Sequence, residues 1–290
     1  MPRNATSISL TARDLELLNV LTRGPHWTDH LLTISQRFEV PFPSVRYLQK
    51  RLVALNNAGL IRSFNSVTLM NHPCRYHKLS RDGWRIIRGD TPPPNKRFFL
   101  ETKPLTQLHQ RYLTDFIVHT DLAAHRAGAT LCNFEPDGSV RLKFPNGLLI
   151  PDAAFDIVTS SGKTLHYYTE LDNSTERLRT TADVESWTRK IRLYDALRDR
   201  SAEPFRVLVV TTQSSERLEH ILSLASELVR NKSRPLFAGV YLDDYEQEPE
   251  PLTMPVFRVQ HRTDLVAPLL QSNGQSKITR TSVTDRVRAC

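Results

Sequence analysis

Apolar residues recur at helical spacing in three segments near the N-terminus. The first segment follows Thr11, a residue suited to capping a helix, and ends near Gly24-Pro25. The second runs from Thr28 to the residues before Pro41, and the third begins after Ser44 and ends at the sequence Asn57-Ala58-Gly59. The apolar residues expected on the buried faces of the first and third helices are Leu15, Leu18, Leu21, Val45, Leu48, Leu52 and Leu55.

Two short runs after the third helix have the composition of β-strands. Residues 60–64 and 75–79 flank the turn-forming sequence Asn71-His72-Pro73, and a further short helix begins at Ser80. Three helices followed by a hairpin are the layout of a winged helix-turn-helix domain, in which the hairpin is the wing. The sequence therefore predicts a DNA-binding domain of this kind over residues 1–90.

A run of three prolines at residues 92–94 predicts a linker over residues 91–104, because consecutive prolines cannot continue a helix. Within residues 105–270, segments with apolar residues at helical spacing alternate with segments typical of β-strands. This pattern predicts a second domain of the α/β (α+β) class with a mixed sheet flanked by helices. Its predicted helices are 105–127, 177–199 and 215–231, the first with Leu105, Leu108, Tyr112, Phe116, Leu122 and Ala123 at helical spacing. The predicted strands are 138–144, 148–158, 164–172, 205–212, 236–242 and 255–260. The polar residues 271–290 are expected to be a disordered tail.

The distribution of charge changes the picture more than the composition does. The net charge of the 290 residues is +8, and residues 1–96 hold 14 lysines and arginines against 6 acids, whereas the remaining residues hold 25 of each. A basic field confined to one small domain favours a polyanionic partner. No stretch is apolar enough to span a membrane and no secretory signal begins the chain, so a cytoplasmic location is expected. The three cysteines are widely spaced, which excludes a zinc finger.

The third helix is the predicted recognition helix, because its outer face carries donors suited to base edges and phosphates. Arg46 and Lys50 lie one helical turn apart on that face. Arg62 and Arg75 lie at the base of the predicted wing, where they can contact phosphate. The predicted DNA-binding residues are Arg46, Tyr47, Gln49, Lys50, Arg51, Arg62 and Arg75.

A second constellation lies in the hairpin that residues 148–158 and 164–172 are expected to form. If residues 159–163 are its loop, facing residues have numbers that sum to 322, so Asp152 faces Glu170 and Asp156 faces His166. One face of the hairpin is apolar and the other carries several carboxylates, including Asp172. Like charges so placed need a compensator, which is a divalent cation, a nearby Lys or Arg, or protonation.

The sequence Pro151-Asp152, followed after this hairpin by Glu170-Leu171-Asp172, resembles the core of the PD-(D/E)xK nucleases. That resemblance implies Mg²⁺ or Mn²⁺ bound by Asp152, Glu170 and Asp172, with the same three residues and a lysine as the catalytic set. Asp172 stands at the lysine position of the motif, and Lys190 on the following helix is the nearest replacement. Whether the protein is an enzyme therefore stays open at this point.

Taken in order, the predicted winged helix, the helix bearing His109, and the sequences PDAAFDI, YYTELDNSTE and KIRLY resemble the replication-relaxation family of bacterial plasmids and mobile elements. The resemblance implies a DNA-binding accessory protein acting in replication, relaxation or mobilisation. Its expected partners are double-stranded DNA, other replication or mobilisation proteins, and a second copy in a homodimer. Two alternatives remain: a metal-dependent DNA endonuclease, and a winged-helix transcriptional regulator whose C-terminal domain dimerises or senses a ligand.

Overall fold

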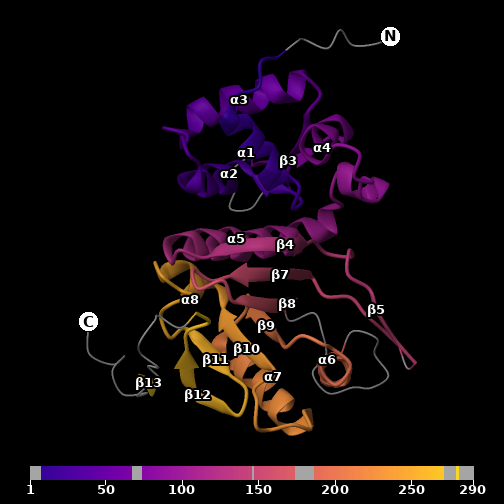
Figure 1. The fold of residues 1–290 in the computed structure, drawn as a ribbon, viewed down its shortest axis with the longest axis vertical. Helices are drawn as coiled ribbons and strands as arrows, with labels where there is room; N and C mark the ends of the chain where they lie inside the picture. The colour runs from indigo at the N-terminus through magenta and orange to yellow at the C-terminus, as the bar shows by residue number, and fades with distance from the viewer. Residues whose placement is uncertain (1–7, 67–73, 146, 174–185, 271–278, 281–290) are drawn as a thin grey trace. The chain divides into compact units, whose positions relative to one another are not determined.

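A computed structural model describes residues 8–66, 74–145, 147–173, 186–270 and 279–280 of the chain (Figure 1). The chain divides into two compact units, residues 1–122 and residues 123–290. Both units combine helices and strands, so the fold is of the mixed α and β class that the sequence predicts. No helix among the described residues is both long enough and apolar enough to cross a bilayer.

The first unit begins with three helices and a small sheet. Its strands pair antiparallel in the order β1-β3-β2. The three predicted helices and the two strands of the predicted hairpin are present, whereas β1 was not predicted. The predicted turn Asn71-His72-Pro73 lies outside the described residues. In chain order the elements are α1 (Ala12–Leu21), β1 (His26–Trp27), α2 (Thr28–Ile34), the 3-10 helix η1 (Ser35–Arg37), α3 (Val45–Asn57), β2 (Ile61–Asn65), β3 (Arg75–Leu79), α4 (Arg81–Arg88), the 3-10 helix η2 (Lys96–Phe99) and α5 (Pro104–Arg126).

The cap of α1 is the one that the sequence predicts. The Thr11 side chain accepts a hydrogen bond from the Asp14 N–H, and the Asp14 carboxylate accepts one from the Thr11 N–H, which completes a capping box. Ser44 occupies the corresponding position before α3, but its side chain makes no capping hydrogen bond.

Two residues expected on buried faces are instead exposed. Leu15 in α1 is 42% exposed and Val45 in α3 is 44% exposed. The buried stripe of α1 contains Leu17, Leu18 and Leu21, and Leu15 lies to one side of it because successive helical residues are rotated by about 100°. In α3 the predicted Leu48, Leu52 and Leu55 are buried as expected.

The first unit extends beyond the predicted linker at residues 91–104 and includes α5 as far as Leu122. Val118 and Leu122 belong to the same apolar core as α1, α2 and α3, whereas Leu105 at the start of α5 is 97% exposed. Polar contacts also join this helix to the preceding elements; they are Arg23–Asp121, Arg37–Asp121, His30–Asp115 and Arg111–Asp29. Such contacts between distant residues leave no periodic signal, which is why the boundary could not be predicted from the proline run.

The second unit is built on an eight-stranded sheet in the order β13-β12-β11-β10-β9-β8-β7-β4. The pairs β8–β9 and β9–β10 are parallel, and the other pairs are antiparallel. A separate two-stranded ribbon pairs β5 with β6. The elements are β4 (Thr130–Glu135), β5 (Leu142–Phe144), β6 (Gly147–Leu149), β7 (Ala153–Val158), β8 (Thr164–Asp172), α6 (Trp187–Arg198), β9 (Phe205–Thr211), α7 (Ser215–Leu228), β10 (Phe237–Tyr241), α8 (Leu242–Gln247), β11 (Phe257–Val259), β12 (Arg262–Ala267) and β13 (Thr279–Arg280).

Helices α6 and α7 pack on one face of this sheet (Figure 1). Trp187 and Tyr194 from α6 and Ile221 from α7 form one buried core with Val207 and Val209 of β9. Alternate residues of a strand point to the same face, so residues of β8 that share a face with Tyr168 lie toward these helices. The face of β8 that carries Glu170 and Asp172 is therefore covered by α6 and α7.

Most of the predicted elements of the second unit are present with shifted ends. The strand predicted at 148–158 is divided into β6 and β7, and the strand predicted at 138–144 is reduced to β5. Strand β4 was not predicted, nor were α8, β12 and β13. The predicted start of the helix at 177–199 lies outside the described residues, and its described part is α6.

Candidate nucleic-acid interface and carboxylate site

The outer face of α3 carries the polar side chains that the sequence analysis predicts to bind DNA. Arg46, Gln49 and Lys50 are exposed, and Tyr47 is 62% exposed. No described residue forms an ion pair with Arg46 or Lys50. The opposite face is held by the buried leucines of α3, so the helix presents its cations outward from a fixed position.

Arg51 differs from its neighbours on α3 because its guanidinium is engaged within the first unit. It donates two hydrogen bonds of 2.6 Å to the carboxylate of Asp14 and a third of 2.8 Å to the carbonyl oxygen of Ser9. Burial by itself would raise the pKa of Asp14, but the hydrogen bonds from Arg51 and Thr11 hold that pKa below its ordinary value. Arg51 therefore joins α3 to the capped end of α1, a role that helical spacing could not reveal.

Arg62 and Arg75 lie on β2 and β3, and both are exposed. Arg62 donates a hydrogen bond of 3.1 Å to the carbonyl oxygen of Phe99, and its guanidinium lies 5.2 Å from the centroid of the Phe64 ring. These contacts hold the Arg62 side chain against the sheet, and the residue stays exposed.

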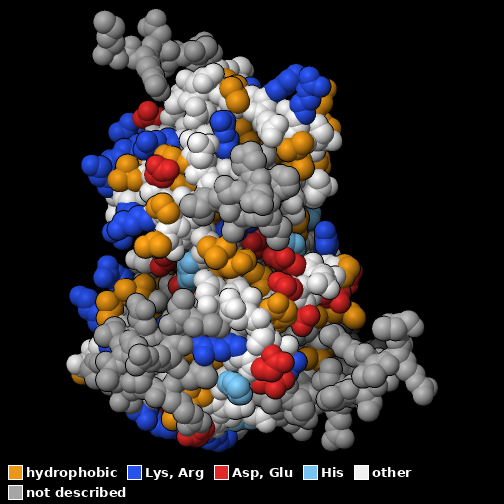
Figure 2. Space-filling view, turned by 180° about the vertical axis from the view of Figure 1, so that it is seen from behind, with side chains coloured by type: hydrophobic (Ala, Val, Ile, Leu, Met, Phe, Trp, Pro, Cys, Tyr) orange, Lys and Arg blue, Asp and Glu red, His pale blue; other side chains and the backbone are white. Residues whose placement is uncertain are grey.

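Further basic side chains were missed by the sequence reading. They are exposed on α4 and η2, and Figure 2 shows Lys and Arg side chains gathered along the left edge of the first unit. Arg85 pairs with Asp82 one turn away on α4. For the residues on α4, the recurrence of arginine along this short helix is the sequence signal that could have indicated them. These residues are Arg81, Arg85, Arg88, Lys96 and Arg97.

The β7–β8 hairpin of the second unit has the predicted register. Ala153 faces Thr169, Asp156 faces His166 and Val158 faces Thr164, so the numbers of facing residues sum to 322. His166 Nδ1 lies 2.7 Å from Asp156 Oδ1, which is the predicted pairing.

Asp152 lies immediately before β7 and next to Glu170. Its N–H donates to the carbonyl oxygen of Thr169 at 3.1 Å, and its carboxylate accepts the Leu171 N–H at 2.8 Å. The ladder thus continues past β7 and brings two carboxylates of the predicted set together.

Glu170 is fully buried beneath α6. Its two carboxylate oxygens accept hydrogen bonds of 2.6 Å, one from Lys190 Nζ and one from the Tyr194 hydroxyl. Burial raises the pKa of Glu170 to about 7; the nearby Asp152 carboxylate adds to this rise and Lys190 opposes it. Lys190 therefore does reach back to the carboxylates, as the sequence predicts.

Asp172, at the lysine position of the nuclease motif, is held by a residue that the sequence reading did not identify. Arg217 of α7 donates from Nε and Nη2 to the two carboxylate oxygens, at 2.9 and 3.0 Å. The indole N–H of Trp187 donates to the same carboxylate at 3.0 Å. A buried bidentate pair of this kind neutralises Asp172 within the second unit.

The compensators of these carboxylates are side chains of the chain itself. Lys190 neutralises Glu170 and Arg217 neutralises Asp172, and a divalent cation at this place would compete with both. Among the residues that the structure describes, no three His, Cys, Asp or Glu side chains are grouped so that they could hold a metal ion. The arrangement as it stands does not fit the predicted magnesium site at Asp152, Glu170 and Asp172.

Comparison with protein families identifies the chain. A model described as replication-relaxation matches residues 28–208, which is more than half of the 290 residues. The chain belongs to the replication-relaxation family. No curated protein matches it, and no solved structure does.

The replication-relaxation match includes both candidate sites. It covers α3 with Arg46 and Lys50 in the first unit, and Glu170 with Lys190 in the second. Asp14 and Arg217, the partners of Arg51 and Asp172, lie outside the matched residues. The helix surface and the Glu170–Lys190 pair are therefore both parts of the segment that is similar to the family.

Proposed function

We propose that this replication-relaxation protein is a DNA-binding accessory factor that acts in the replication, relaxation or mobilisation of a plasmid or mobile element. The observation that carries the proposal is the outer face of α3, where Arg46, Tyr47, Gln49 and Lys50 are exposed while the leucines behind them are buried. A helix of 13 residues is about 20 Å long and fits the major groove of a duplex. The excess basic charge of residues 1–96 attracts the phosphate backbone to this unit.

In this proposal the first unit acts as a winged helix-turn-helix. Helix α3 reads the groove, and the β2–β3 hairpin is the wing that brings Arg62 and Arg75 to the backbone. Phosphate contacts set the affinity and the register, whereas contacts from α3 to base edges set the specificity.

The test is the affinity of the full chain for duplexes selected from a random-sequence pool. Replacing both cations, Arg46→Ala with Lys50→Ala, is expected to weaken binding at least tenfold, which is about 1.4 kcal/mol. If both side chains contact phosphate, the slope of log affinity against log salt should also decrease by about 1.8.

The matched control removes two exposed cations of the second unit, Arg141→Ala with Arg192→Ala. This variant loses the same net charge and is expected to bind as the unmodified chain does. Equal affinities for the α3 variant and the control at moderate salt would contradict the proposal.

A metal-dependent endonuclease is the second candidate, because Asp152, Glu170 and Lys190 lie together in the second unit. It would require a metal ion to displace Lys190 from Glu170 and Arg217 from Asp172. The accessory role predicts that supercoiled plasmid stays intact with Mg²⁺ or Mn²⁺, and that Asp152→Ala and Glu170→Ala leave duplex affinity unchanged. Nicking that requires the metal and disappears in both variants would replace the accessory role with the endonuclease.

A further inference from the structure

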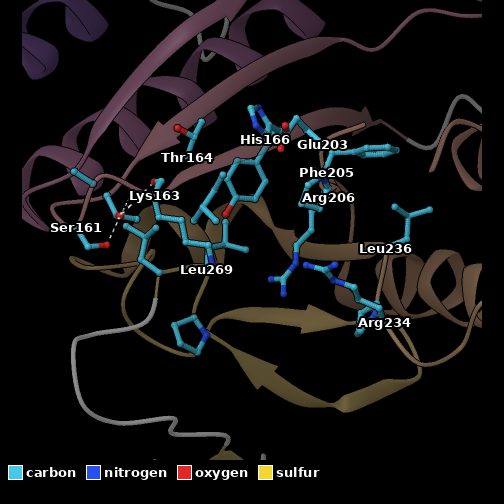
Figure 3. A pocket seen from close by; sticks show the side chains of 18 of the residues that line it. Ser161, Lys163, Thr164, His166, Glu203, Phe205, Arg206, Arg234, Leu236 and Leu269 are labelled. Atoms are coloured by element: carbon cyan, nitrogen blue, oxygen red, sulfur yellow. Dashed lines mark hydrogen bonds between the residues drawn. The ribbon is translucent and has the colours of Figure 1, made fainter. Parts of the chain in front are cut away.

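The second unit contains an open pocket with a volume of about 940 Å³ (Figure 3). It lies where β8 and β9 begin, and residues 159–163, 234–236 and 268–270 also line it. Glu170 and Asp172 lie near the other end of β8, so the pocket is separate from the carboxylate site.

Positive charge in the pocket exceeds negative charge. Lys163, Arg206 and Arg234 are exposed in it, and none of them forms an ion pair with a described residue. In Figure 3 the side chains of Arg206 and Arg234 extend into the pocket from different segments. Like charges gathered in one cavity repel each other unless an anion lies between them.

The other charged groups of the lining do not offset this excess. His166 is engaged by Asp156, and Arg198 donates to the Asp195 carboxylate and to the carbonyl oxygen of Arg234. Glu203 is the one carboxylate among the described lining residues. The pocket therefore holds three cations against one carboxylate, and none of the three forms an ion pair with a described residue.

The remaining lining is suited to the organic part of a ligand. Tyr167 is buried and faces Arg206 across the parallel pair of strands, and Leu236 and Leu269 add apolar surface. The loop at the pocket rim carries hydroxyl groups, two of which, on Thr159 and Ser161, lie 2.9 Å apart. Cavities of about 300–1,000 Å³ with apolar walls and a few converging polar groups are the usual form of a small-molecule site.

We propose that this pocket binds a small phosphate-bearing organic molecule, with the phosphate held between Arg206 and Arg234. Guanidinium groups bind phosphate oxygens in a bidentate manner, and Lys163 adds a point charge at the rim. The apolar lining contacts the organic part. The same chemistry is offered by a free mononucleotide and by the 5′-phosphorylated end of a nucleic-acid strand, so these are the two sources to distinguish.

The experiment measures binding to the full chain by calorimetry. The probes are inorganic phosphate, a deoxynucleoside monophosphate, and a short single-stranded oligonucleotide with or without a 5′-phosphate. Phosphate-bearing probes are expected to bind, and Arg206→Ala with Arg234→Ala should weaken them at least tenfold. Arg206→Lys with Arg234→Lys keeps the charge but loses the bidentate geometry, so it should weaken binding by a smaller factor.

The Arg141→Ala with Arg192→Ala variant again serves as the control for charge, and thermal unfolding shows that each variant is folded. If the monophosphate competes with the 5′-phosphorylated strand for the site, both sources use it; if only one of them binds, that one is the source. The inference fails if neither the monophosphate nor the 5′-phosphorylated strand binds, if the strand is the one probe that binds and does so equally with and without its 5′-phosphate, or if the control weakens binding equally.

The outcome is independent of the proposed function. Arg46→Ala with Lys50→Ala is expected to lose duplex affinity while keeping phosphate binding in the pocket. Loss of the pocket ligand in the Arg206 and Arg234 variant, with duplex affinity retained, would show that the two sites act separately.

Discussion

At the scale of single residues, Asp14 shows how one buried carboxylate can organise its surroundings. It closes the capping box of α1 with Thr11 and receives two charge-assisted hydrogen bonds from Arg51 of α3. The carboxylate is 1% exposed, so its charge depends on these partners for stabilisation.

Replacing Arg51 should therefore affect stability more than the exposed cations beside it do. We expect Arg51→Ala to lower the free energy of unfolding by about 2 kcal/mol, because a buried carboxylate loses its charged partner. Arg46→Ala on the same helix should change it by less than about 0.5 kcal/mol. Urea denaturation measures both, and equal effects would show that the Asp14–Arg51 pair is not stabilising.

Two buried histidines of the first unit make its stability depend on pH. Burial lowers the pKa of His26 to about 3 and that of His77 to about 4. Above pH 6.5 both histidines are neutral in the folded chain and in the unfolded chain, so they do not lower the free energy of unfolding there. Below pH 6.5 the unfolded chain binds protons that the folded chain does not, so stability is lost as the pH falls toward 4.

For His77→Gln we expect a smaller loss of stability between pH 6.5 and pH 4 than in the unmodified chain. The difference in slope should approach about 1.4 kcal/mol per pH unit, which corresponds to one proton. Glutamine keeps groups that can bond to Thr28 and Ser63, the present partners of the ring. Unfolding measured in steps of pH tests this, and parallel curves for the two proteins would contradict it.

At the scale of secondary structure, buried polar bonds connect β8 to the helices that cover it. Glu170 is bonded to Lys190 and Tyr194 of α6, and Asp172 is bonded to Trp187 of α6 and Arg217 of α7. A buried ion pair is costly to break from one side, because the remaining charge has no partner. These bonds therefore join α6 to the sheet in addition to their shared apolar core.

Lys190→Met should destabilise the second unit in a pH-dependent way. The folded pKa of Glu170 is raised to about 7, so the contribution of this group is complete below its ordinary pKa of 4.5 and is lost as the pH rises toward 7. We expect the substitution to cost about 3 kcal/mol at pH 8 and clearly less at pH 5, where Glu170 is protonated.

The companion variant combines Lys190→Met with Glu170→Gln. In it the carboxylate of residue 170 is replaced by a neutral amide, so loss of Lys190 leaves no unpaired charge at that position. The free energy of unfolding of this double variant, measured by denaturant, should differ much less between pH 8 and pH 5 than that of Lys190→Met. A Lys190→Met variant that loses as much stability at pH 5 as at pH 8 would show that Glu170 is ionised across the range.

At the scale of the whole molecule, the chain folds as two units, and the first one needs part of α5. Residues 104–122 supply Val118 and Leu122 to the core and Asp115 and Asp121 to its ion pairs. We expect a fragment of residues 1–122 to unfold cooperatively on heating, and a fragment of residues 1–103 to unfold at a clearly lower temperature. Circular dichroism measures both, and equal transition temperatures would show that α5 does not stabilise this unit.

The sequence by itself determined the features that depend on neighbouring residues. Helical spacing located α1, α2 and α3, and the Thr11 cap follows from one residue type at one position. Placing the hairpin loop at residues 159–163 predicted the register that pairs Asp156 with His166. The localisation of basic charge in residues 1–96 and the resemblance to the replication-relaxation family also needed no coordinates.

The tertiary structure decided which charged groups of distant segments meet where no sequence pattern indicated the contact. Arg51 and Asp14 are 37 residues apart, Arg217 and Asp172 are 45 apart, and the pocket with Arg206 and Arg234 is assembled from several distant segments. Periodicity shows which face of an element is apolar, but it does not show which element packs there. For that reason the sequence could identify Asp152, Glu170 and Asp172 as a group of carboxylates that needed compensation, with Lys190 as the nearest cation. Only packing showed that Lys190 pairs with Glu170 and that Arg217, which the sequence did not indicate, pairs with Asp172.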